Sequence, residues 1–282
     1  MSRSRSSGAA AFPKPKTTVR LTETALMLAL SAVLSLLPLM ELPYGGSITV
    51  ASAVPILIIA YRYGARWGLF ASFAFSLLQL LFGLKNLSYA TSFLAATAIL
   101  FLDYLLAFSA FFAGAWFRNK LASQSAALGL GAFCACALRY LCHVISGCTV
   151  WAGISIPTKA ALLYSLSYNA TYMIPETLVT VLAAVYLGRA LDLRSERFTR
   201  LSAHPKSGLA LRVLAGLLLT GVAVFDIVHV FAPLQNTESG EFSLAGLSTV
   251  PWLLLGIVTG VGVVIAAVLW LIGGRKLYKS NE

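Results

Sequence analysis

Apolar runs long enough to cross a bilayer recur along almost the whole chain, and they restrict the fold more than any other feature of the sequence. A membrane-spanning helix needs about 20 apolar residues, and the runs here reach that length and are rich in Leu, Ala and Val. A transmembrane β-barrel would instead show alternating polarity over segments of about ten residues. Because 59% of the residues are hydrophobic and 11% charged, against about 25% charged in soluble proteins, we predict an all-α polytopic membrane protein.

Charged residues, Pro and Gly divide this apolar sequence into eight predicted spans. The spans cover residues 21–40, 47–61, 67–83, 93–116, 127–149, 160–188, 208–231 and 248–273. Of the 21 Lys and Arg residues, 17 fall in segments on the side of the membrane that carries both termini. Since positive residues are enriched in cytoplasmic loops, we expect both termini to be cytoplasmic.

The first span could be taken for a signal peptide, and the four cysteines for a metal or redox site, but the sequence favours neither interpretation. The span at 21–40 is longer than the core of a typical signal peptide and no clear small-x-small site follows it, so we expect it to be retained. The cysteines all lie in span 127–149 without CxxC or Cys/His metal spacing, so we expect them to be packing residues, with no metal and no cofactor. They are Cys134, Cys136, Cys142 and Cys148.

Ionisable residues inside the spans are candidates for function, because a charge in hydrocarbon is costly. Internal structural pairing is the other explanation for such residues. Arg139 and His143 are four residues apart and therefore share one helix face, which predicts a polar chamber beside that helix. The full set comprises Asp103, Arg139, His143, Glu176, Asp226 and His229.

A polar stripe marks span 160–188. Ser165, Asn169, Tyr172 and Glu176 follow the spacing i, i+4, i+7, i+11, so they lie on one face of an otherwise apolar helix. Such a face is expected to contact protein or water rather than lipid. The pattern alone leaves open whether the stripe binds a ligand or joins helices by hydrogen bonds.

Five sequence motifs, taken together, resemble the thiamine-binding S component of energy-coupling factor (ECF) transporters, the ThiT family. They are Leu102-Asp-Tyr-Leu-Leu-Ala-Phe108, Leu138-Arg-Tyr-Leu-Cys-His-Val-Ile-Ser-Gly147, Tyr164-Ser-Leu-Ser-Tyr-Asn-Ala-Thr-Tyr-Met-Ile-Pro175, Tyr44-Gly-Gly-Ser-Ile-Thr49 and Pro55-Ile-Leu-Ile-Ile-Ala-Tyr-Arg-Tyr-Gly64. The likeness extends over about residues 17–190, which would hold the six helices of such proteins. It implies a vitamin receptor, not an enzyme, in a bacterial cell membrane. It also implies ATP-driven uptake together with a transmembrane T component and two cytoplasmic ATPases.

The resemblance also implies a set of thiamine-binding positions. Asp103 matches an acidic position that would offset the thiazolium charge, and His143 and Trp151 match ring positions that would stack on the ligand. Arg139 matches a basic position that either orients Asp103 or bonds the ligand. An interfacial belt residue is the other interpretation of Trp151. The complete set is Asp103, Tyr104, Arg139, His143, Trp151, Tyr164 and Asn169.

A partner surface is implied as well. Ala25 and Ala29 match an AxxxA surface that the family uses against the T component, and small residues let helices approach closely. The other explanation is that Ala is simply common in membrane helices. The chain has no GxxxxGK[ST] motif, so ATP-driven transport would need separate ATPase subunits.

The chain departs from the family pattern in two places. Gly46 stands where some members have Trp, and residues 191–282 extend beyond the six-helix unit. We therefore predict a six-helix core followed by a two-helix hairpin. The predicted segments are a cytoplasmic tail at 1–20, a substrate-binding membrane domain at 21–190, a basic cytoplasmic linker at 191–207, a hairpin at 208–273 and a cytoplasmic tail at 274–282.

Two other classes of function are less compatible with the sequence. A proton-coupled secondary transporter would use Asp103, His143 and Glu176 as a relay, but the chain shows no convincing internal repeat. An intramembrane enzyme would need a nucleophile–base pair or a metal cluster, and no HExxH, GxSxG or paired-carboxylate pattern occurs.

Overall fold

The protein is a bundle of long helices, seen in a computed structural model that describes residues 12, 15–42, 46–90, 92–148, 159–201, 208–234 and 244–279. Within these residues, seven helical stretches are long and apolar enough to cross a membrane, which agrees with the predicted fold class. Six of them are α1 (Thr17–Ser35), α3 (Ala65–Phe82), α6 (Gln124–Ser146), α7 (Lys159–Ala190), α8 (Leu209–Phe231) and α9 (Trp252–Lys279).

The seventh stretch changes helix type along its length. It consists of α4 (Phe93–Ala98), the π-helical η3 (Ile99–Leu106), α5 (Ala107–Ser109) and the 3₁₀-helical η4 (Ala110–Ala115). A π-helical turn inserts extra residues per turn and so changes the face on which a side chain emerges, and such turns are frequent at functional sites. The acidic candidate Asp103 lies inside this π-helical part.

The predicted span at 47–61 is instead a short strand followed by a short helix. Strand β2 covers Ser47–Thr49, and helix α2 covers Val54–Tyr63. A helix of 10 residues is about 15 Å long, which is half the thickness of the bilayer core. The side chains of α2 are buried from Val54 to Arg62, which explains why this segment is apolar on every side.

The first helix ends earlier than the predicted span at 21–40. Pro38 has no backbone N–H and disfavours helical geometry in the residue before it, so the chain leaves α1 after Ser35. Residues Pro38–Glu41 form strand β1, which pairs antiparallel with β2. We call the paired strands β1 and β2, together with Leu42 and Gly46, the outer hairpin.

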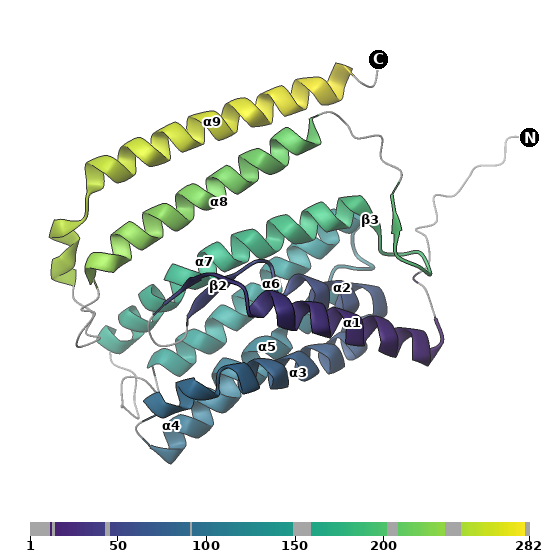
Figure 1. Ribbon diagram of the computed structural model, residues 1–282, viewed down its shortest axis with the longest axis horizontal. Coiled ribbons are helices and arrows are strands. Elements are labelled where there is room, and N and C mark those ends of the chain that lie inside the picture. The colour runs from purple at the N-terminus through teal and green to yellow at the C-terminus, as the bar shows by residue number, and fades with distance from the viewer. Residues whose placement is uncertain are drawn as a thin grey trace, which may run out of the picture.

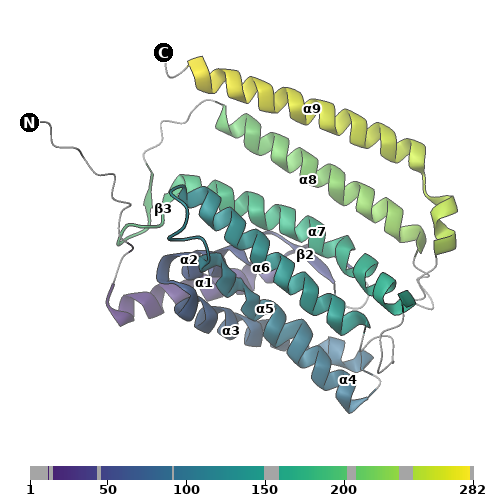
Figure 2. The ribbon, with the colours of Figure 1, turned by 180° about the vertical axis from the view of Figure 1, so that it is seen from behind.

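The helices are arranged with α1 and the C-terminal hairpin on different sides of the bundle (Figure 1). Helix α1 packs against α2 and α3, whereas α8 packs against α7 and α9 packs against α8. The view from behind shows the same succession of α7, α8 and α9 (Figure 2). The short remaining elements are η2 (Leu84–Tyr89), β3 (Leu191–Asp192), β4 (Thr199–Arg200), η6 (Ala232–Leu234) and η7 (Leu244–Thr249).

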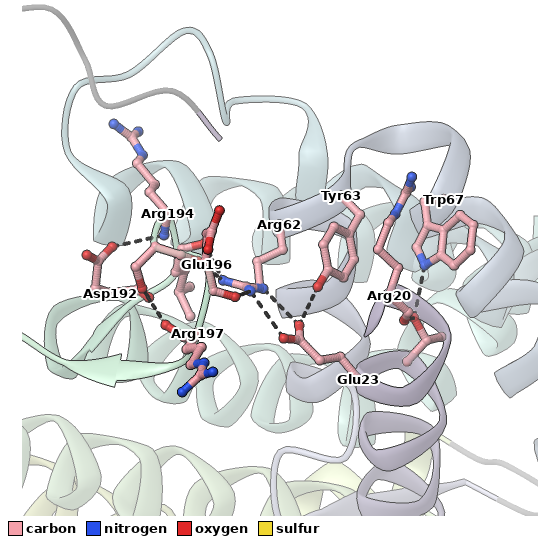
Figure 3. A network of polar contacts seen from close by, with 12 residues as sticks. Arg20, Glu23, Arg62, Tyr63, Trp67, Asp192, Arg194, Glu196 and Arg197 are labelled. Carbon is pink, nitrogen blue, oxygen red and sulfur yellow. Dashed lines mark hydrogen bonds and ion pairs between the residues drawn. The ribbon is translucent and has the colours of Figure 1, made fainter. Parts of the chain in front are cut away.

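A polar network closes the end of the bundle where α1 begins and α7 ends, which we call the basic end (Figure 3). The fully buried Arg62 donates to both carboxylate oxygens of Glu23 on α1, at 3.1 and 3.3 Å. Its other donors reach backbone carbonyls in the segment 193–196, at 2.8 to 3.0 Å. All five N–H donors of this guanidinium are therefore used, which joins α1, α2 and the segment after α7.

Candidate functional site

Asp103 and His143 are the centre of a buried polar cluster, although they are far apart in the sequence. The Asp103 Oδ1 atom lies 2.8 Å from Nδ1 of His143 on α6, and the Ser146 hydroxyl donates to Oδ2 at 2.6 Å. Because an ionised carboxylate can only accept hydrogen bonds, Nδ1 of His143 carries the proton. With the proton on Nδ1, a neutral ring carries its lone pair on Nε2, a buried atom without a hydrogen-bond partner among the described residues.

The polar stripe of α7 faces α6 at the level of this cluster. The Ser165 hydroxyl donates to the Val144 carbonyl at 2.8 Å, and the Asn169 amide nitrogen lies 3.3 Å from the His143 carbonyl oxygen. The close approach needs Gly147, because a Cβ atom there would lie 2.3 Å from the Ser165 hydroxyl oxygen. The stripe therefore joins helices, and it also brings Asn169 next to the His143 backbone.

Tyrosine rings extend the cluster along α7. The rings of Tyr164 and Tyr168 are stacked with centroids 5.9 Å apart and an interplanar angle of 4°. The ring of Tyr172 meets that of His143 edge-on at 6.0 Å, and its hydroxyl donates to Oδ1 of Asn169 at 2.6 Å. The tyrosine rings of α7 thus form an aromatic row that adjoins the polar groups of the cluster.

Arg139 pairs with Glu176 rather than with Asp103 in the described contacts. The Arg139 Nη1 atom lies 3.9 Å from Oε1 of Glu176, and the guanidinium carbon lies 4.4 Å from the Phe108 ring centroid. Glu176 also accepts hydrogen bonds from the Thr49 backbone N–H at 2.6 Å and the Thr49 hydroxyl at 2.8 Å. This carboxylate thus compensates Arg139 and holds the outer hairpin against α7.

Tyr104 has a different environment from its neighbour Asp103. Its hydroxyl donates to the Gly83 carbonyl at 3.0 Å and accepts from the Asn86 side chain at 2.8 Å. Both partners belong to the segment that follows α3. Tyr104, which lies in the π-helical stretch, therefore supports the segment after α3.

The remaining sequence candidates are located as follows. Trp151 lies outside the described residues. Ala25 and Ala29 are exposed on α1, whose buried positions Thr24 and Ser31 face the other side of that helix. The structure thus brings Asp103, His143 and Asn169 together, whereas Arg139, one helical turn from His143 on α6, pairs with Glu176. The last candidate, Tyr164, lies on the same face of α7 as Tyr168, and the two rings are stacked.

Two polar members of the cluster, Ser146 and Thr49, belong neither to the predicted site nor to the predicted polar stripe of span 160–188. Ser146 follows His143 by three residues on the same helix face, so its spacing carries a signal that could have identified it. Thr49 carries no such signal, because it is distant in sequence from Glu176 and only the folded chain brings them together.

The ionisable residues of the C-terminal hairpin form a separate group. Asp226 on α8 accepts a hydrogen bond from the Thr259 hydroxyl on α9 at 2.6 Å. Nδ1 of His229 lies 2.9 Å from the Phe225 carbonyl oxygen of its own helix. The Asp226–Thr259 contact joins the two helices of the hairpin, and neither contact involves a candidate site residue. No group of three or more His, Cys, Asp or Glu side chains suited to a metal occurs within the described part of the chain.

Comparison with known proteins shows that the part of the chain that holds this cluster matches a known protein family. The family described as Thiamine transporter protein (Thia_YuaJ) matches residues 21–194, which is more than half of the chain and ends just after α7. The Thiamine transporter ThiT of Bacillus subtilis (strain 168) is 29% identical over 195 residues, covering 64% of this chain and 97% of that protein. The family match therefore includes every residue of the polar cluster and leaves out α8 and α9.

Proposed function

This chain belongs to the thiamine transporter protein family, and on that premise we propose that it is the thiamine-binding S component of an ECF-type importer. In this role it binds thiamine within the membrane bundle and delivers it with a T component and two separate cytoplasmic ATPases. The observation that carries the proposal is the buried cluster of Asp103, His143 and Ser146 inside a helical membrane protein.

The charge balance of the cluster suits a monocation. Asp103 contributes one negative charge, while the charges of Glu176 and Arg139 cancel each other across 3.9 Å. With Asp103 ionised and His143 neutral, the net charge of these four side chains is minus one. A fixed cation such as the thiazolium ring of thiamine would restore neutrality, which lowers the cost of holding a charge away from water.

The hydrogen-bonding groups suit the other half of the ligand. Nε2 of His143 and Oδ1 of Asn169 offer lone pairs to the exocyclic amino group of an aminopyrimidine. The Tyr164 ring supplies a flat surface for stacking. Arg139 is paired with Glu176, and Tyr104 is hydrogen-bonded to the segment after α3, so we assign these two a supporting role in binding. Trp151 lies within the residues that match the family, and we include it as a ring that stacks on the ligand.

The partner surface is assigned to α1. Ala25 and Ala29 are exposed there, and the C-terminal hairpin packs on α7 and leaves α1 uncovered. Small side chains on a lipid-facing helix allow a second helix to approach closely, which suits docking of the T component.

The orientation follows from the charge distribution. The basic end carries Arg62, Arg118 and Arg194, and positive residues are enriched on the cytoplasmic side of membrane proteins. We therefore place the basic end and both termini in the cytoplasm. The outer hairpin, at the other end of α1 and α7, then faces the medium from which the vitamin is taken up.

The test has two parts. First, the protein is purified without added ligand and its co-purified small molecule is identified by mass spectrometry, with thiamine as the expected result. Second, uptake is measured in cells that hold the ECF module, with ATP depletion and a protonophore applied separately. Loss of uptake on ATP depletion supports the proposal. Uptake that survives ATP depletion but collapses with the protonophore would overturn it in favour of proton coupling.

A further inference from the structure

Tyr172 contacts three parts of the candidate site at once. Its hydroxyl donates to Asn169, its ring meets that of His143 edge-on, and Gly46 of the outer hairpin lies against the ring. A Cβ atom on Gly46 would lie 2.7 Å from Cδ1 of this ring, so only glycine allows the hairpin backbone to pack there. Tyr172 is only 5% exposed, so its hydroxyl has a defined environment.

The direction of the Tyr172 hydrogen bond is dictated by the backbone. Nδ2 of Asn169 lies 2.8 Å from the Ser165 carbonyl oxygen and 3.3 Å from the His143 carbonyl oxygen. Carbonyl oxygens only accept, so the amide must turn its NH₂ group toward them and its oxygen toward Tyr172. The tyrosine hydroxyl must therefore donate its single hydrogen to Oδ1 of Asn169.

The consequence is an array of acceptors. Once its hydrogen is used, the Tyr172 oxygen has only lone pairs to offer, and Oδ1 of Asn169 keeps one further lone pair. Nε2 of His143 is also an acceptor, because Asp103 holds the proton on Nδ1. Oη of Tyr172 and Oδ1 of Asn169, 2.6 Å apart, thus both accept hydrogen bonds, and the neighbouring His143 ring, which meets that of Tyr172 edge-on at 6.0 Å, adds a third acceptor.

We propose that Tyr172 is a specificity-determining residue, which together with Asn169 and His143 selects ligands that present an amino group over those that present an oxo group. The inference rests on the proposed function and deepens it, because it concerns the chemistry recognised at the same site. A pyrimidine with an exocyclic amino group would donate to this array. An oxo group at that position would place lone pairs against lone pairs, which is unfavourable in a desolvated site.

The test compares two ligands on the purified full-length protein. The dissociation constant is measured by calorimetry for thiamine and for its analogue in which an oxo group replaces the exocyclic amino group. In the wild-type protein thiamine should bind at least about a hundredfold more tightly. If the wild type binds thiamine and the oxo analogue equally well, the proposed selection by the acceptor array is wrong, and no result with a variant would restore it. If it binds no thiamine, the proposed function fails as well.

The variant Tyr172→Phe isolates the hydroxyl and keeps the ring against Gly46. We expect it to weaken thiamine binding about tenfold and to change binding of the oxo analogue less than twofold, so that the selectivity ratio falls about tenfold. Tyr140→Phe is the matched control, since it removes a tyrosine hydrogen bond between α6 and α7 whose acceptor is the Leu166 carbonyl instead of the Asn169 side chain. A parallel loss for both ligands in Tyr172→Phe, with the ratio kept, would show a structural role and overturn the inference.

Discussion

The carboxylate of Asp103 is the group on which thiamine binding should depend most. Asp103→Asn keeps the size of the side chain and removes its charge. The hydrogen bonds around this position tolerate the change. The amide oxygen can still accept a hydrogen bond from Nδ1 of His143, and the Ser146 hydroxyl can rotate to accept one from the new NH₂ group. The expected loss is therefore electrostatic rather than a failure of packing.

The magnitude follows from Coulomb's law. A carboxylate and a thiazolium ring about 5 Å apart attract each other by about 3 kcal/mol at an effective dielectric constant of about 20. The Asp103 side chain is 17% exposed, so solvent screens part of this energy. A loss of at least about 1.4 kcal/mol remains, which corresponds to a dissociation constant at least about tenfold higher.

The assay is titration calorimetry on purified protein, with Asp226→Asn as the matched control. Asp226 is also a hydrogen-bonded acid within a membrane span, but its partner Thr259 belongs to the C-terminal hairpin. We expect the control to keep the wild-type dissociation constant. An unchanged constant in a monodisperse Asp103→Asn protein, or an equal loss in both variants, would refute the assignment of Asp103 as the counter-charge.

Three further predictions concern ligand charge, partner docking and the hairpin. Free thiamine should bind more tightly than its diphosphate, because Asp103 repels the phosphates and Arg139 is already paired; tighter binding of the diphosphate in calorimetry would contradict the charge balance. Replacing both Ala25 and Ala29 with Trp should abolish uptake in cells while the purified protein still binds thiamine, and loss of both activities would indicate a misfolded core. Deleting residues 203–282 should leave the dissociation constant for thiamine nearly unchanged, since the polar cluster and the carbonyls that hold the basic end all precede the cut. A truncated protein that is monodisperse yet binds no thiamine would show that the hairpin completes the site.

Much of the candidate site can be located from sequence, because a polar residue in an apolar span is conspicuous. The spacing of Asn169 and Tyr172 on α7 predicted a shared face, and both residues lie in the cluster. The pairing of Arg139 could not be assigned in the same way. Sequence left Asp103 and the ligand as its two options, and the fold supplies Glu176 instead.

The sequence by itself determined that the chain is a helical membrane protein. Backbone groups in hydrocarbon must find partners within their own segment, so the length and apolarity of each run suffice to predict a helix. The same local reasoning extends to the polar face of α7, because residues on one helix face are related by spacing alone.

Only the tertiary structure decided which polar groups meet. The π-helical turn in η3 alters the direction of its side chains, so that Asp103 reaches His143 while its neighbour Tyr104 bonds the segment after α3. The strand pairing of the outer hairpin brings Thr49 to Glu176. Such contacts depend on the rotation and axial offset of one helix against another. These are set by close packing across the whole bundle, and no local pattern in the sequence encodes them.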